Sequence, residues 1–201
     1  SARNFSNDFR EKLGVKDDEI LVLSNRGLAP VYDIETFIKA AKKSTLKSTK
    51  LKFVIAGGGP EADNLKNLVN DLGLESTVIF TGRLSDADFA TLTASCDIYV
   101  STSTSDGGIA ASVAEAMACE KPVLVTSFGE NADWVIKRGV AGRIFNIGDY
   151  ETLSENILEL SDQKELRESM GAKGRQIISE FNNASLEALK ADAMYEKILS
   201  S

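Results

Sequence analysis

Arginine, glycine and glutamate stand beside short apolar runs of this chain, and these residue types suit the binding of a phosphorylated ligand. Arg26 follows one apolar run, and the pair Gly107 and Gly108 precedes a helix-like stretch that contains Glu115. Arginine forms charge-assisted hydrogen bonds with phosphate oxygens, and glycine lets the backbone approach a ligand closely. A helix N-terminus offers unpaired amides to an anion. We therefore expect the amides of residues 108–111 to cradle a pyrophosphate and Glu115 to accept hydrogen bonds from a ribose diol.

The elements that must position these residues alternate along the chain. Helix-like stretches occupy residues 33–43, 61–72, 86–95 and 111–119. Around them lie apolar runs of strand length, most of them β-branched or aromatic throughout, at residues 20–24, 52–57, 77–82, 97–102, 122–127 and 142–146. Such runs are typical of parallel strands covered on both faces. The pattern predicts an α/β, doubly wound, Rossmann-like domain with a six-stranded, mainly parallel sheet and helices on both faces.

The two ends of the chain differ from this alternating middle. Residues 1–18 are polar, and we interpret them as a lead-in or interdomain segment. Residues 19–201 are predicted to form a single domain, because three prolines and the absence of a Gly/Ser tract leave no internal linker. After residue 150 the pattern is helical only, over 151–160, 163–180 and 185–199. This helical C-terminal tail is expected to wrap the sheet or to reach toward a missing partner.

Composition excludes several classes of function. The 201 residues have a net charge of −7, which disfavours nucleic-acid binding through a broad basic face. Histidine is absent, so no histidine-based catalysis or metal ligation is available. No apolar run approaches the roughly 20 residues that span a bilayer, and no signal peptide is recognisable. Cys96 and Cys119 are interpreted as buried, reduced thiols of a cytosolic protein.

The stretch SDGGIAASVAEAMACEKPVLVT at 105–126 resembles the signature of the retaining family 4 glycosyltransferases, which have the two-domain GT-B architecture. The donor-binding half of that family typically reads Glu, seven residues, Glu, then Ala-Met-Ala, a small residue or two and Pro-Val. Further stretches in the same order, such as FVIAGGGPEADNLKNLVNDLGLESTVIFTGRLSD, extend the resemblance over about 16–199. The resemblance implies the C-terminal, donor-binding domain of an enzyme that uses a nucleotide-diphosphate sugar and no metal. The N-terminal acceptor-binding domain has no counterpart here, so the chain is either an excised half or a separate polypeptide.

The same resemblance implies roles for individual positions. Glu115 matches the glutamate that holds the ribose hydroxyls, and Arg26 is the nearest candidate for the arginine that contacts the diphosphate. The loop at 82–84 matches the backbone that contacts the base, and 108–111 match amides that face the diphosphate and the donor sugar. The predicted donor-binding residues are Arg26, Gly58, Gly59, Gly82, Arg83, Leu84, Asp106, Gly107, Gly108, Ile109, Ala110, Ala111 and Glu115, with no catalytic residue and no metal ligand assigned.

Three departures from the signature affect this assignment. The first glutamate is missing, because Gly107 stands eight positions before Glu115 and the nearest acid, Asp106, stands nine before. Either Asp106 takes the sugar-binding role or that role is lost. The lysine usual a few residues after the first-loop arginine is absent, and Glu120 replaces a glycine.

Other hypotheses stay open beside the donor domain. The departures favour a non-catalytic nucleotide-sugar-binding or assembly module, and a sugar epimerase is a weaker alternative. GGGPEA at 57–62 also fits a dinucleotide fingerprint, although the acid expected after the next strand is missing. Asp86 and Asp88 resemble a metal-binding Asp-x-Asp, but an N-cap at Ser85 explains them better.

The resemblance also implies where and how the intact enzyme works. Transfer to a growing polysaccharide or a lipid-linked glycan is expected, with little or no transfer by this domain alone. We expect a cytoplasmic location, with the cytoplasmic face of the membrane as an alternative for the intact enzyme.

Overall fold

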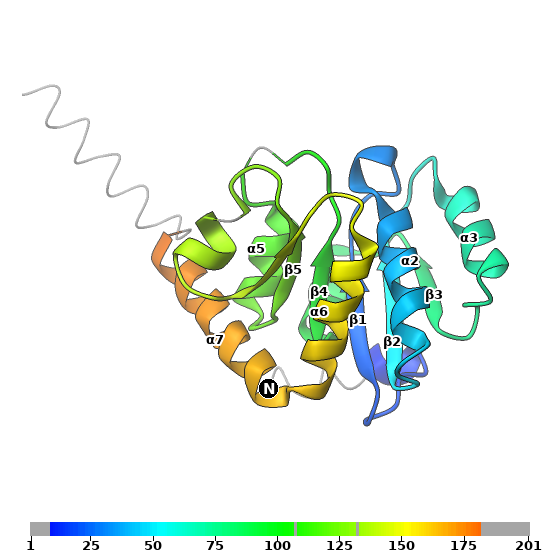
Figure 1. Ribbon diagram of the computed structural model, residues 1–201, viewed down its shortest axis with the longest axis horizontal. Coiled ribbons are helices and arrows are strands. Elements are labelled where there is room, and N and C mark those ends of the chain that lie inside the picture. The colour runs from blue at the N-terminus through cyan, green and yellow to red at the C-terminus, as the bar shows by residue number, and fades with distance from the viewer. Residues whose placement is uncertain (1–8, 107, 132, 182–201) are drawn as a thin grey trace, which may run out of the picture.

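The computed structural model describes residues 9–106, 108–131 and 133–181, and it shows a layered α/β domain (Figure 1). Neighbouring strands of the sheet are parallel throughout, in the order β3-β2-β1-β4-β5-β6. The strands are β1 (Ile20–Ser24), β2 (Leu51–Ala56), β3 (Val78–Gly82), β4 (Ile98–Ser101), β5 (Val123–Thr126) and β6 (Gly142–Phe145). The predicted Rossmann-like sheet is confirmed. Its order reverses between β1 and β4, where ligands of this fold bind.

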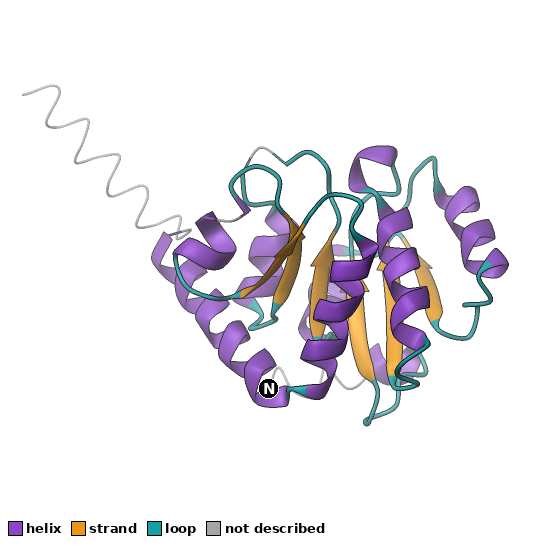
Figure 2. Ribbon diagram, in the orientation of Figure 1, coloured by secondary structure: helices purple, strands orange, loops and turns teal. Residues whose placement is uncertain are grey.

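Helices cover both faces of the sheet (Figure 2). One face is covered by α2 (Ile34–Thr45), α3 (Ala62–Asp71) and α6 (Tyr150–Asp162), and the other by α4 (Asp86–Ser95), α5 (Ala111–Ala118) and α7 (Lys164–Phe181). Two separate apolar clusters result, because successive strand residues point to opposite faces. Val22 packs under the first group of helices and Leu23 under the second. The doubly wound arrangement is therefore confirmed, with short helical turns added at Pro30–Tyr32 and, in π form, at Asp133–Lys137.

The helical tail wraps the sheet as far as residue 181. α6 packs against α2 and α7 packs against α5, with Leu153, Ile157 and Ile177 almost fully buried. The predicted stretch at 185–199 lies outside the described residues. Over the described ranges, none of the helices combines the length and the apolar character that a bilayer span requires.

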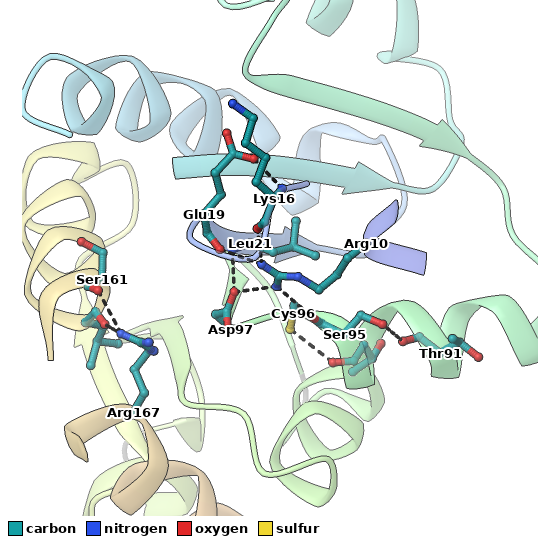
Figure 3. A network of polar contacts seen from close by, with 12 residues as sticks. Arg10, Lys16, Glu19, Leu21, Thr91, Ser95, Cys96, Asp97, Ser161 and Arg167 are labelled. Carbon is teal, nitrogen blue, oxygen red and sulfur yellow. Dashed lines mark hydrogen bonds and ion pairs between the residues drawn. The ribbon is translucent and has the colours of Figure 1, made fainter. Parts of the chain in front are cut away.

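The described part of the polar leading segment is fastened to the domain by Arg10 (Figure 3). Its guanidinium donates to the Asp97 carboxylate at 2.8 Å and to the Glu19 carbonyl at 2.6 Å. Asp97 also accepts from the Leu21 amide at 2.8 Å, so one carboxylate joins the leading segment to β1 and β4. Phe9, the residue before Arg10, is buried in the second apolar cluster, with 8% of its surface exposed. The domain boundary near residue 18 stays a prediction.

The turn between α5 and β5 contains Glu120, which stands where the glycosyltransferase signature has a glycine. Glu120 has a φ of 60°, in the left-handed region that favours glycine. α7 crosses this turn closely, since a Cβ on Gly171 would lie 2.0 Å from the Glu120 carbonyl oxygen. Glycine is thus the relaxed residue at position 120, and glutamate there is strained.

Glu120→Gly is expected to stabilise the fold by about 1 kcal/mol, because the left-handed strain disappears. The exposed ion pair from Glu120 to Arg175, at 3.5 Å, contributes little to stability. Thermal unfolding should show a rise in Tm of roughly 2–4 °C. Glu120→Ala is the control, since it removes the ion pair and keeps the strain. Equal shifts in both variants would contradict this account of the turn.

Candidate functional site

A cavity of about 640 Å³ opens at the carboxyl ends of β1 and β4, between α4 and α5. It lies at the reversal of the strand order, where the fold predicts a ligand. Polar and apolar side chains both line it, which suits a ligand with a charged part and a flat, less polar part. The lining residues are Asn25, Arg26, Gly27, Tyr32, Asp86, Phe89, Ala90, Thr93, Ala111, Ser112, Glu115, Ala118 and Cys119.

Arg26 lies at the wall of this cavity with its guanidinium fixed on several sides. Nη2 donates to Asp106 at 2.7 Å, and Nη1 donates to the Ser112 hydroxyl at 3.0 Å. The Tyr32 ring lies 4.6 Å from the guanidinium carbon, so Tyr32 stacks on Arg26. Nε is buried and, within the described part of the chain, makes no hydrogen bond. An unpaired buried donor is costly.

The loop that carries Arg26 is held in place by a series of buried hydrogen bonds. The Tyr99 hydroxyl donates to Asn25 Oδ1 at 2.7 Å, and Asn25 Nδ2 donates to the Thr93 hydroxyl at 3.1 Å. Tyr99 is fully buried, and this burial raises the pKa of its hydroxyl. These hydrogen bonds therefore keep the neutral Tyr99 phenol and the fixed Asn25 amide next to Arg26.

The N-terminus of α5 faces the same cavity. Its N-cap is Ala110, which offers no side-chain acceptor, so the first amides of the helix remain available to a ligand. Gly108 has a φ of 155°, in the range that favours glycine. Gly107 lies outside the described residues. The predicted amide cradle at 108–111 therefore stands beside Arg26, although its contact with a ligand stays a prediction.

Glu115 lies one turn into α5 and lines the cavity opposite the arginine loop. In the described ranges its carboxylate has neither a hydrogen-bond partner nor an ion pair. Partial burial, and then the negative charge of Asp86, raise the pKa of Glu115 above its ordinary value. A carboxylate in this environment gains from hydroxyl donors, which a ribose would supply.

A smaller cavity of about 250 Å³ adjoins the first and shares Asn25, Arg26, Gly27 and Phe89 with it. Arg83 and Leu84 line it, at the loop that follows β3. Gly82 ends β3, and its carbonyl accepts from the Gly57 amide at 2.9 Å. The structure thus brings the predicted base-contacting loop next to the predicted phosphate-contacting arginine.

Gly58 and Gly59 lie where two loops approach each other closely. A Cβ on Gly59 would lie 2.2 Å from the Leu28 carbonyl oxygen, whereas one on Gly58 would meet only the flexible Arg83 side chain at 3.0 Å. The Leu28 amide donates to the Gly58 carbonyl at 3.1 Å. Loop packing therefore explains Gly59 without a ligand, and donor contact by either glycine stays a prediction.

Several lining residues were missed by sequence reasoning. Ser112 bonds Arg26, and its only sequence signal was a hydroxyl among the small residues of a helix start. Tyr32 stacks on Arg26, and its sequence signal was only an aromatic residue in the loop after the first strand. The expectation for Cys119 is wrong, because this residue is only half-buried and lines the cavity.

Two other predictions near the site can be tested on the structure. Ser85 caps α4, its hydroxyl accepting from the Asp88 amide at 3.2 Å, so the N-cap interpretation is confirmed. Among the described residues, no group of three or more Cys, Asp or Glu side chains is placed to hold a metal ion. Cys96 is fully buried as predicted, and burial raises the pKa of its thiol to about 12.

Comparison with known proteins adds a family context to this geometry. The sequence profile of the family described as glycosyl transferases group 1 matches residues 5–177. An uncharacterised glycosyltransferase from Methanocaldococcus jannaschii is 37% identical over 136 residues, which cover 67% of this chain and 34% of that protein. A GDP-mannose-dependent monoacylated alpha-(1-6)-phosphatidylinositol monomannoside mannosyltransferase from Corynebacterium glutamicum is 29% identical over 172 residues, covering 83% of this chain and 44% of that protein.

The fold has close counterparts among solved structures. HepE from Anabaena, crystallised in complex with UDP, superposes with a TM-score of 0.84 at 23% identity, over 96% of this chain and 53% of that chain. A likeness at this level of identity shows the fold. The chain spans between a third and a half of the length of the two curated relatives above.

Proposed function

Because the chain belongs to the glycosyl transferases group 1 family, we propose that it is the donor-binding half of a retaining glycosyltransferase of GT-B architecture. In this proposal the cavity between α4 and α5 binds a nucleotide-diphosphate sugar. An N-terminal domain of the same enzyme then supplies the acceptor. The solved relative HepE holds UDP, and the Corynebacterium relative is named for its use of GDP-mannose. Both facts support a nucleoside diphosphate as the common part of the ligand.

The position of Arg26 beside the uncapped start of α5 supports the proposal more than any other single observation. A guanidinium fixed next to uncapped helix amides matches the acceptor oxygens of a diphosphate. The residues that line the two cavities then suggest where the ribose and the base would lie. Glu115 would accept from the ribose hydroxyls, and the base would lie toward Arg83 and Leu84 in the adjoining cavity.

The proposed chemistry follows from where negative charge develops. As the bond between sugar and diphosphate breaks, charge accumulates on the departing phosphate oxygens. Arg26 and the first amides of α5 are oriented to stabilise that charge, and we propose that they do so without a metal ion. Transfer also needs an acceptor pocket and the exclusion of water on domain closure, so the domain alone should transfer little. For the intact enzyme we propose a cytoplasmic location.

A second candidate function is a nucleotide-sugar-binding module that has lost catalysis. The observation that favours it is the ion pair between Arg26 and Asp106, which occupies a donor needed by the phosphate. Both functions predict nucleotide binding, and a transfer assay of the full-length protein separates them. Turnover with a nucleotide sugar would support the enzyme, and binding without turnover would support the module.

Calorimetric titration with UDP, GDP and ADP tests the proposed site, using wild type and Glu115→Gln. Loss of one carboxylate acceptor for a ribose hydroxyl should weaken the preferred nucleotide about tenfold or more, because hydrogen bonds to charged groups contribute about 1.5–3 kcal/mol. Glu120→Gln is the matched control, since this exposed residue follows the same helix and lies outside the cavity lining. Its affinity should equal that of wild type. Equal affinities for wild type and Glu115→Gln would remove Glu115 from the proposed site.

A further inference from the structure

Asp106 occupies the position on Arg26 that a phosphate oxygen would need. Its Oδ1 accepts from Nη2 of Arg26 at 2.7 Å, and only 11% and 13% of the two side chains are exposed. Asp106 is also fixed through its backbone. A Cβ on Gly129 would lie 2.8 Å from the Asp106 carbonyl oxygen, so the loop after β5 packs directly against it. The ion pair is therefore built into the meeting of two loops.

A carboxylate in this place opposes a diphosphate in two ways. It uses one of the guanidinium donors that bind phosphate bidentately. It also adds negative charge a few ångströms from the ligand, where partial burial weakens screening by salt. Neutralising it while keeping its shape would remove the charge and weaken the competing hydrogen bond, because an amide oxygen is a poorer acceptor for a guanidinium than a carboxylate. The Nη1 bond to Ser112 and the stacking on Tyr32 would still orient Arg26.

We propose that Asp106 sets the affinity of this site by competing with the diphosphate for Arg26, an inference that rests on the proposed function. In the empty site Asp106 neutralises Arg26. When the donor binds, a phosphate oxygen replaces the carboxylate on Nη2, and the free energy of that ion pair is subtracted from binding. Asp106 thus keeps the affinity low, which favours release of the nucleoside diphosphate product.

This role differs from contact with the donor sugar, the other role open to Asp106. A sugar-binding carboxylate strengthens the binding of a nucleotide sugar and leaves the free nucleoside diphosphate unaffected. A competing carboxylate weakens the binding of the nucleoside diphosphate itself. The sign of the effect on UDP, a ligand without a sugar, therefore separates the two roles.

The test titrates wild type and Asp106→Asn with UDP, with GDP and with ADP, and then compares the preferred diphosphate with its parent nucleoside. Asp106→Asn should bind the diphosphate about tenfold more tightly, the size of effect expected for one like charge removed at close range. The affinity for the nucleoside should not change, because it presents no phosphate to Arg26. Asp106→Ser is a second variant for the case that Asp106→Asn fails to fold. The control is Asp63→Asn, which removes a negative charge from an exposed side chain of α3 outside both cavities, and should change the affinity by less than about threefold.

The possible outcomes test this inference separately from the proposed function on which it rests. Equal or weaker diphosphate binding by a folded Asp106→Asn, with clear binding by wild type, would overturn the inference and leave the donor site intact. The same gain for the nucleoside as for the diphosphate would also overturn it, because the effect would not involve phosphate. Absence of binding by both proteins to all three diphosphates would remove the proposed function and the inference together.

Discussion

Arg26→Met should weaken binding of the preferred nucleoside diphosphate about hundredfold, the largest loss we expect at the site. Methionine keeps much of the apolar volume of arginine and can still pack on Tyr32. It removes the charge and every guanidinium donor, including the unpaired Nε. Two charge-assisted hydrogen bonds to a phosphate, at roughly 1.5 kcal/mol each, amount to about a factor of one hundred. Calorimetric titration measures the affinity, and thermal unfolding establishes that the variant is folded.

The comparison with Arg26→Lys and with a double variant identifies the cause of that loss. Lysine keeps the charge and loses the planar fork, so Arg26→Lys should fall between wild type and Arg26→Met. In Arg26→Met the Asp106 carboxylate also stays partly buried beside the site without its partner. Adding Asp106→Asn should therefore recover part of the affinity, and a double-mutant cycle measures this coupling. A Kd for Arg26→Met equal to that of wild type would exclude Arg26 from the ligand site.

Much of the fold could be predicted from the sequence because its information is local. Six apolar runs and the helical stretches between them give the elements, and both rest on periodicity within a few residues. The contact of Arg10 with Asp97 could not be predicted, since it joins residues 87 positions apart in a segment that is polar overall. The π-helical turn at Asp133–Lys137 was likewise missed, because its sequence resembles a loop that follows a strand.

The candidate site also has features that the sequence predicts and features that it does not. Its location follows from the rule that parallel sheets bind ligands beyond their carboxyl ends, and the structure brings Arg26, Ser112 and Glu115 to one cavity there. The pairing of Arg26 with Asp106 was not predictable, because it depends on the conformations of two loops that follow different strands. The donor contacts assigned by resemblance stay predictions. What the structure adds is the carboxylate that neutralises Arg26.

Gly59→Ala should destabilise the domain by about 3 kcal/mol, which corresponds to a loss in Tm of roughly 6–12 °C. The added methyl group would lie 2.2 Å from the Leu28 carbonyl oxygen and 2.8 Å from the Leu28 amide nitrogen. These are backbone atoms, and rotation of a side chain cannot relieve the overlap. The two loops would have to separate, which strains the bonds from Leu28 to Gly58 and from Glu61 to Leu28. Thermal and urea unfolding measure the loss.

Two glycine controls separate loop packing from other causes. Gly58→Ala places its methyl group against the movable Arg83 side chain and should lower the stability by less than about 1 kcal/mol. Gly73→Ala has open space around its Cβ but a φ of 65°, so it measures left-handed strain alone, about 1 kcal/mol. A Gly59→Ala loss no larger than these would contradict the close approach of the two loops. If Gly58→Ala instead has the Tm of wild type and binds the nucleotide more weakly, Gly58 contacts the donor as the resemblance implies. Stability and affinity therefore assign different roles to two neighbouring glycines, because only one of them is required by the fold.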